Sequence, residues 1–142
     1  MKGWLFYALG TAVALAAADF CVKQASGKLS NSVALLIYGS CTFVAGLGWV
    51  LWQRLRGMPQ YAQMPGVWAA LGVGVAFSIV TLGLYATFGA GAPISVASPF
   101  IRLGGLVLAS LAGLTLLREP ITGRYLIGML LACLGVYLIV TR

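Results

Sequence analysis

Asp19 and Arg102 are the residues of this sequence best suited to do chemistry, because each lies inside a long apolar block. An ionised side chain is costly in a membrane and usually faces a polar cavity or a partner charge. A buried carboxylate can bind a proton or a cation, and a guanidinium can bind a carboxylate through two parallel hydrogen bonds. Tyr85 contributes a hydroxyl from a third block. These residue types predict the binding of an ion or a small polar molecule.

Five apolar blocks must position these side chains, and they occupy nearly all of the 142 residues. A helix that crosses a bilayer needs about 20 mostly apolar residues. The blocks are continuous, whereas the strands of a membrane barrel would alternate. We therefore predict an all-α fold, an integral membrane bundle of five transmembrane helices. The chain is expected to form a single domain over residues 1–142, with helices at approximately 3–25, 32–53, 67–88, 95–117 and 121–141.

The alternating direction of consecutive helices places the polar residues in one layer. With a rise of about 1.5 Å per residue, Asp19 and Arg102 are both expected about 6–8 Å beyond the membrane midplane. Tyr85, late in the third block, reaches the same layer. Serine and threonine residues recur at helical spacing on the same faces of the third and fourth helices. We predict a polar cavity between the first, third and fourth helices that binds substrate or ion and is lined by Asp19, Arg102, Tyr85, Thr81, Ser78 and Ser98.

A purely structural interpretation of the same residues is the alternative. Asp19 and Lys23 are four residues apart, in the favourable orientation for a helical ion pair. Arg102 could extend its guanidinium to the lipid headgroups. Serine and threonine in membrane helices often donate hydrogen bonds to their own helix. Under this interpretation there is no cavity.

Small residues recur on the fourth helix at a spacing of four. Gly105, Ala109 and Gly113 form a run that allows close approach of another helix. We predict that this run is a helix-packing seam, either within the chain or between chains. The fifth block has no such stripe, so we expect its helix at the periphery.

Composition supports a membrane protein and narrows its chemistry. Hydrophobic residues make up 61% of the chain and charged residues 8%, which leaves no room for a soluble domain. The net charge is +7, but the nine basic residues are spread singly over helix ends and loops. This pattern predicts contact with anionic lipid rather than nucleic acid. The chain has no histidine and no CxxC pair, so we expect no enzyme, no metal site and no cofactor, with the cysteines as apolar fillers.

Basic residues near the helix ends give a weak orientation. Five lie on the N-terminal side and three on the other, which favours a cytoplasmic N-terminus. The former are Lys2, Arg54, Arg56, Arg118 and Arg124, and the latter are Lys23, Lys28 and Arg142. All four tryptophans are expected at the N-terminal-side interface, as an aromatic belt. The first block imitates a signal peptide, but its basic region is a single lysine, so we expect the first helix to be retained.

The C-terminal half resembles the end of an EamA-type module of the drug/metabolite transporter superfamily. The matching segments are AGAPIS at residues 90–95, REPIT at 118–122, Ile127-Gly128 and LGVYLI at 134–139. Phe20 and Lys23 also resemble the residues that end the first helix of such modules. Arg118 departs from the pattern, which usually has glycine before the glutamate. The resemblance covers the whole chain and is most specific from residue 90 onward.

The resemblance implies a secondary transporter of small metabolites or drugs, an exporter or exchanger in the cell (inner) membrane. Such transporters usually combine two five-helix modules in inverted orientation, with the site at their interface. This chain has one module, so we expect a partner: a homodimer, with an antiparallel, dual-topology arrangement favoured, or a second five-helix module. The related small multidrug resistance proteins carry an acidic residue in their first helix that binds a proton or a cation. Asp19 resembles it, although Asp19 lies deeper and is an aspartate.

Two other functions remain open at this point. The chain could be a non-transporting assembly or regulatory subunit of a membrane complex, or a subunit of a lipid-linked sugar flippase. A transporter requires a hydrated cavity beside the polar stripes, whereas an assembly subunit would pack those stripes against other helices.

Overall fold

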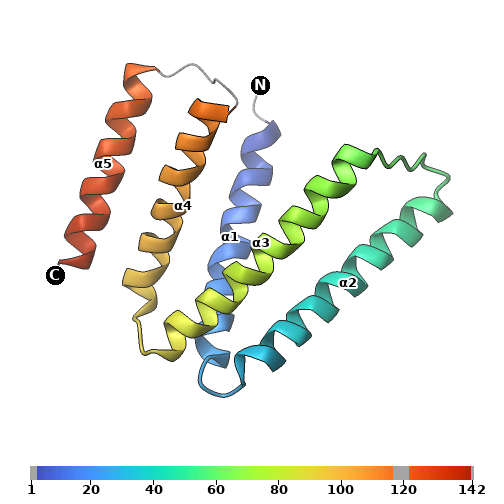
Figure 1. Ribbon diagram of the computed structural model, residues 1–142, viewed down its shortest axis with the longest axis horizontal. Helices are drawn as coiled ribbons and strands as arrows, with labels where there is room; N and C mark the ends of the chain where they lie inside the picture. Colours follow the sequence, from blue (N-terminus) through green and yellow to red (C-terminus); the bar gives the residue numbers. More distant parts are fainter. Residues whose placement is uncertain (1–2, 117–121, 142) are drawn as a thin grey trace. The chain divides into compact units, whose positions relative to one another are not determined.

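The computed structural model describes residues 3–116 and 122–141, and over these residues the chain is helical with short connections (Figure 1). Its helices are α1 (Gly3–Ala25), α2 (Asn31–Leu55), α3 (Met64–Gly89), α4 (Ile94–Leu116) and α5 (Gly123–Val140). All five are long and apolar enough to cross a membrane. The predicted all-α fold with five candidate membrane spans is therefore confirmed. That the chain is half of an inverted repeat stays a prediction.

The helix boundaries differ slightly from the predicted ones. α3 begins at Met64, three residues before the predicted position 67, because Pro65 is compatible with the first helical turn. α2 extends over Asn31–Leu55, beyond the predicted 32–53. α5 begins at Gly123. Thr122 precedes it in an extended conformation and occupies the N-cap position. The predicted end of the fourth helix at 117 and start of the fifth at 121 lie outside the described residues.

The chain divides into two compact units, Met1–Ala90 and Gly91–Arg142. In the first unit, α3 packs against both α1 and α2 (Figure 1). The turn from α1 to α2 is tight, and Gly27 adopts a φ of 79° that few other residues tolerate. Ser30 caps α2 by accepting a hydrogen bond from the N–H of Val33 at 3.5 Å.

The end of α2 is closed by backbone hydrogen bonds. The N–H of Gly57 donates to the carbonyl of Arg54 at 3.1 Å, and that of Met58 donates to the carbonyl of Gln53 at 3.1 Å. Gly57 has a φ of 67°, as this Schellman-type ending requires. The loop then turns back along the helix, since the side-chain amide of Gln60 donates to the carbonyl of Val50 at 2.9 Å. The carbonyls of Trp52, Gln53 and Arg54 thus accept backbone N–H groups rather than a charged side chain.

In the second unit, α4 packs against α5. The hydroxyls of Ser110 and Tyr125 form a hydrogen bond between the two helices. An apolar groove also lies between them, lined by Phe100, Leu103, Gly104, Val107, Leu108, Cys133, Val136, Tyr137 and Val140. Pro99 lies inside α4 and provides no backbone N–H to the helical ladder.

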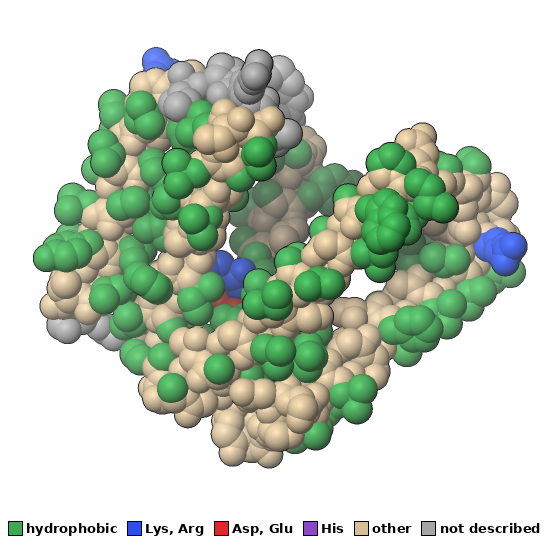
Figure 2. Space-filling model, in the orientation of Figure 1, with side chains coloured by type: hydrophobic (Ala, Val, Ile, Leu, Met, Phe, Trp, Pro, Cys, Tyr) green, Lys and Arg blue, Asp and Glu red, His purple; other side chains and the backbone are tan. Residues whose placement is uncertain are grey.

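Few side chains are buried within the chain. The buried residues among those described are Ala34, Phe88, Ala97 and Gly113, together with the polar Asp19 and Thr81. Large apolar side chains cover the helix surfaces instead (Figure 2). In a bilayer these surfaces contact lipid, where an exposed leucine or valine carries no penalty. The buried polar residues therefore stand out against the rest of the molecule.

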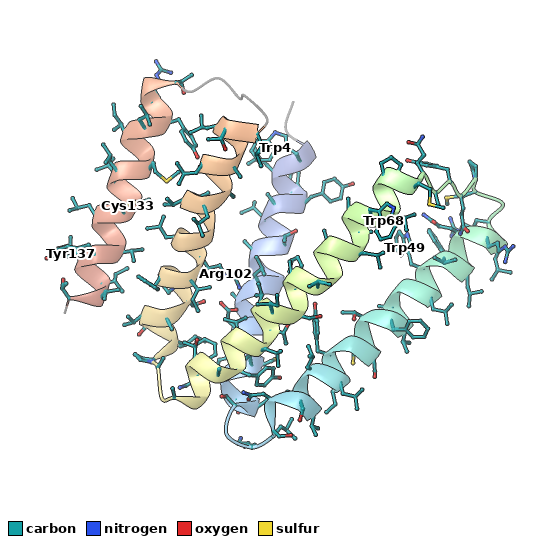
Figure 3. All side chains as sticks on the ribbon, in the orientation of Figure 1. Trp4, Trp49, Trp68, Arg102, Cys133 and Tyr137 are labelled. Carbon is teal, nitrogen blue, oxygen red and sulfur yellow. The ribbon has the colours of Figure 1, made fainter. Side chains whose placement is uncertain are left out.

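The tryptophans of the first unit gather toward one end. Trp4 lies at the start of α1, Trp68 near the start of α3 and Trp49 in the last part of α2 (Figure 3). All four tryptophan side chains are exposed, Trp52 least at 40%. This arrangement suits an aromatic belt at a membrane interface.

Candidate functional site

The Asp19 carboxylate is one of the least exposed side chains in the molecule. It is 4% exposed, close to the values of Ala34 at 2% and Phe88 at 3%. The other residues of α1 are exposed or half-buried, and the small residues expected on the same face, Ala8, Thr11, Ala12 and Ala16, are all exposed. Burial on α1 is therefore concentrated at its single acidic residue. A buried carboxylate in a membrane helix must be compensated locally, which makes it a candidate binding group.

Two contacts fix how α1 faces α3. The hydroxyl of Ser26 donates to the backbone carbonyl of Tyr85 at 3.0 Å. The ammonium of Lys23 lies 5.6 Å from the ring centroid of Phe88, within cation–π range. A Cβ added to Gly89 would lie 3.3 Å from the Ser26 hydroxyl, so the two helices approach closely here. Asp19, Lys23 and Ser26 share one face of α1 by their spacing of four and three, and this face points toward α3.

The same contacts place Asp19 and Thr81 at one level. α1 and α3 run in the same direction (Figure 1). Seven residues correspond to about two helical turns. Asp19 lies seven residues before Ser26, and Thr81 lies seven residues before Phe88. Both residues are buried, at 4% and 8% exposed. The first unit therefore brings a carboxylate and a hydroxyl into one buried layer.

The hydroxyls of Ser78 and Thr81 donate hydrogen bonds to backbone carbonyls of their own helix, α3. Thr81 donates to the carbonyl of Phe77 at 2.8 Å, and Ser78 donates to the carbonyl of Gly74 at 2.8 Å. Such hydrogen bonds to the preceding turn are common for serine and threonine in membrane helices, and they leave the binding role of these two residues a prediction. Each oxygen keeps lone pairs, so both side chains can still accept a hydrogen bond. Any ligand bound here would have to donate to them.

Ser78 lines a groove that the sequence analysis did not anticipate. The groove lies between α2 and α3 and has a volume of about 540 Å³. Its lining residues are Leu35, Tyr38, Gly39, Thr42, Val73, Gly74, Phe77 and Ser78. Two glycines, one on each helix, leave the space open, since neither would place a Cβ within 4 Å of another helix. The polar stripe of α3 is thus divided between this groove and the α1 contact.

Arg102 and Ser98 lie on α4, in the second unit. They are four residues apart on one face, with Arg102 exposed and Ser98 half-buried. Arg102 is labelled in Figure 3. Tyr85, in the first unit, is half-buried. The first unit therefore holds Asp19, Thr81, Ser78 and Tyr85, and the second holds Arg102 and Ser98; a common cavity for all six stays a prediction.

The predicted seam on α4 does not face α5. The side of α4 in contact with α5 carries Leu103, Val107 and Ser110, about 150° around the helix from Gly105 and Ala109. Gly105 and Ala109 are exposed, and a Cβ at Gly105 would meet no atom within 4 Å in the described part of the chain. Gly113 is buried. The seam is therefore open along its Gly105–Ala109 part.

Comparison with family models, curated proteins and solved structures finds no match for this chain. The resemblance to EamA-type modules therefore stays a prediction that rests on the motif residues themselves. Part of the REPIT motif, residues 118–121, lies outside the described residues. The three cysteines are free and exposed on their helices. In the described residues no three His, Cys, Asp or Glu side chains gather into a metal-binding group.

The Lys23–Phe88 contact was missed by the sequence analysis, in which the only side-chain partner considered for Lys23 was Asp19. Phe88 is 3% exposed and is the most buried large side chain described. The available signal was an aromatic residue in the last turn of the third block, at the membrane depth of Lys23. A sequence contains many such pairs, and only the packing of α1 on α3 selects this one.

Proposed function

We propose that this chain is one module of a secondary membrane transporter for small metabolites or drugs, with Asp19 as its ion- or substrate-binding carboxylate. The observation that carries the proposal is the burial of Asp19 at 4% exposed, in a chain whose apolar side chains remain largely exposed. Folding stability gives little reason to keep a carboxylate in this position, because desolvation of the charge opposes folding. A binding role provides that reason.

The chemistry of the Asp19 layer suits a ligand that carries a proton or a positive charge. The carboxylate accepts hydrogen bonds, and the hydroxyl oxygen of Thr81 also accepts, since its proton is given to Phe77. Arg102, on α4 in the second unit, is proposed separately as a donor for an anionic group of the substrate. A zwitterionic or cationic small molecule, or a coupling proton, matches this set of groups.

A second module is part of the proposal. Transporters built from inverted repeats hold their site between two modules. The small face of α1 beyond Asp19 is exposed, and so is the Gly105–Ala109 part of α4. Surfaces of small residues allow helices to approach closely. A second copy, in antiparallel orientation, would cover them and complete the cavity.

The function is tested with purified protein in liposomes. A panel of labelled zwitterionic, cationic and anionic metabolites and cationic dyes is offered with and without a pH gradient. Uptake of at least one compound above protein-free liposomes supports a transporter. If no compound is transported by protein that is inserted and oligomeric, an assembly or regulatory role becomes the better description.

We predict that the chain inserts in both orientations. The split of five basic residues against three is too even to impose one topology on every copy. Reporters fused to the C-terminus, one active only in the cytoplasm and one only outside it, should both give signal in the same cells. Adding two lysines at the N-terminal side should shift the balance toward one orientation. Signal from a single reporter would exclude the antiparallel homodimer. A parallel dimer or a different second module would then be the remaining arrangements.

Gly105→Leu is expected to reduce oligomer content without lowering the stability of the monomer. The side chain finds open space within the chain, but it would separate helices that meet at this seam. Oligomer content is measured by crosslinking in the membrane, and stability by thermal unfolding in detergent. Gly104→Leu is the matched control, since it lies one residue away on the groove shared with α5. If the two variants had equal oligomer content, the seam would not be a contact between copies and would face lipid.

A further inference from the structure

We propose that the end of α2 is a binding site for the phosphate of an anionic membrane lipid, with Arg56 over Trp52 as the phosphate-binding group and Arg54 adding positive charge at the same helix end. This site is separate from the proposed transport site. It goes beyond general attraction to an acidic membrane because it assigns the headgroup to particular side chains.

The geometry prepares one guanidinium for a phosphate. The guanidinium carbon of Arg56 lies 4.4 Å from the centroid of the Trp52 ring, which is the distance of a stacked cation–π pair. The rings of Trp49 and Trp52 are 5.2 Å apart and tilted by 39°. A guanidinium held over a ring loses rotational freedom, while its N–H groups that do not face the ring can still donate. Such an edge binds phosphate through two parallel hydrogen bonds.

These arginines are not needed to end the helix. The carbonyls of Gln53 and Arg54 already accept the backbone N–H groups of Met58 and Gly57. The helix dipole contributes roughly half a negative charge at this end, so two guanidiniums leave a net positive charge of about 1.5. Both side chains are exposed. The positive charge is therefore available to an external anion.

The chain itself offers little to neutralise this charge. It contains only two acidic residues, Asp19 and Glu119. Asp19 is buried in α1, six residues before the end that leads into α2, whereas Arg56 follows the whole 25-residue length of α2. That length corresponds to about 37 Å. Glu119 lies outside the described residues.

The position along the membrane normal selects a lipid as the anion. At about 37 Å, α2 exceeds the hydrocarbon thickness of about 30 Å, so its end reaches the headgroups. The exposed tryptophans of the first unit lie toward this end (Figure 3). Basic side chains are visible there on the surface (Figure 2). A phosphate in the headgroup layer is the anion present at highest local concentration.

The test is a lipid titration of the purified protein followed by native mass spectrometry. Short-chain phosphatidylglycerol and phosphatidylcholine are added separately to the protein in detergent. Wild type should bind one phosphatidylglycerol in preference to phosphatidylcholine. Arg56→Gln should weaken phosphatidylglycerol binding about tenfold, because a pair of charge-assisted hydrogen bonds is lost. Arg56→Lys should recover only part of the binding, since an ammonium neither stacks nor binds in bidentate fashion.

Two further variants make the outcome decisive. Lys28→Gln removes an equal charge from the α1–α2 turn, at the other end of α2, and should bind as wild type does. Trp52→Leu keeps both arginines but removes the stacking ring, and should weaken binding in the same direction as Arg56→Gln. Equal loss in Lys28→Gln and Arg56→Gln would reduce the effect to net charge and overturn the proposal. So would wild-type binding by both Arg56→Gln and Trp52→Leu.

Discussion

Asp19→Asn is expected to abolish transport, or its dependence on a pH gradient, while the protein stays folded and inserted. Asparagine keeps the shape of the side chain but has no carboxylate to bind a proton or a cation. The buried position on α1 would then lose its negative charge. Transport is measured in liposomes and normalised to the amount of folded protein.

The structural alternative predicts a different result for the same variant. If Asp19 serves only to pair with a neighbouring cation, Asp19→Asn should lower stability and leave transport per folded molecule unchanged. Asp19→Glu retains the carboxylate and should keep measurable transport. Ser40→Ala is the control, because it removes an exposed hydroxyl from α2, outside the proposed site. Arg102→Ala should impair anionic and zwitterionic substrates most. Undiminished normalised transport in Asp19→Asn and Arg102→Ala would end the cavity hypothesis.

Phe88→Ala is expected to destabilise the first unit by about 3 kcal/mol, as a large truncation at a buried aromatic site does. Phe88 is 3% exposed and also carries the Lys23 ammonium over its ring. Its removal leaves a cavity between α1 and α3 and deprives Lys23 of its partner ring. Thermal unfolding in detergent, followed by circular dichroism at helix wavelengths, measures the change.

The matched control is Phe43→Ala on α2, where the ring is 70% exposed. The Phe43 ring is mostly uncovered, so its truncation removes few contacts within the chain, and this variant should unfold close to the wild-type temperature. Lys23→Met keeps most of the side-chain length without the charge and should lie between the two. Equal unfolding temperatures for Phe88→Ala and Phe43→Ala would show that the α1–α3 contact contributes little.

The helices could be predicted from the sequence because their signal is local. A run of about 20 apolar residues commits a segment to a spanning helix irrespective of its neighbours. The small errors arose at the ends, where Met64 and Pro65 extend α3 into a segment with the composition of a loop. Proline is compatible with the first turn, so its presence did not mark the boundary correctly.

The neighbours of each side chain could be predicted only in part. In a soluble protein the apolar face of a helix identifies the core, but lipid and protein interior are both apolar. Nothing in the sequence of α3 distinguishes Phe88, which is buried, from Phe77, which is 52% exposed. Asp19 was found because a charge is conspicuous in such surroundings. The groove of Tyr38, Thr42 and Ser78 was missed because weakly polar residues are common on any membrane helix.

The scarcity of buried residues has a consequence for how this sequence can change over evolutionary time. Where a side chain contacts only lipid, one branched apolar residue serves as well as another, so most positions of α5 are free to drift among leucine, isoleucine and valine. Ala34, at 2% exposed, has no such freedom, because any larger side chain there must displace a neighbour. Two copies of this module could therefore differ at most sequence positions and still assemble in the same way. Their common ancestry would be recognisable from the sequence at only a few buried positions.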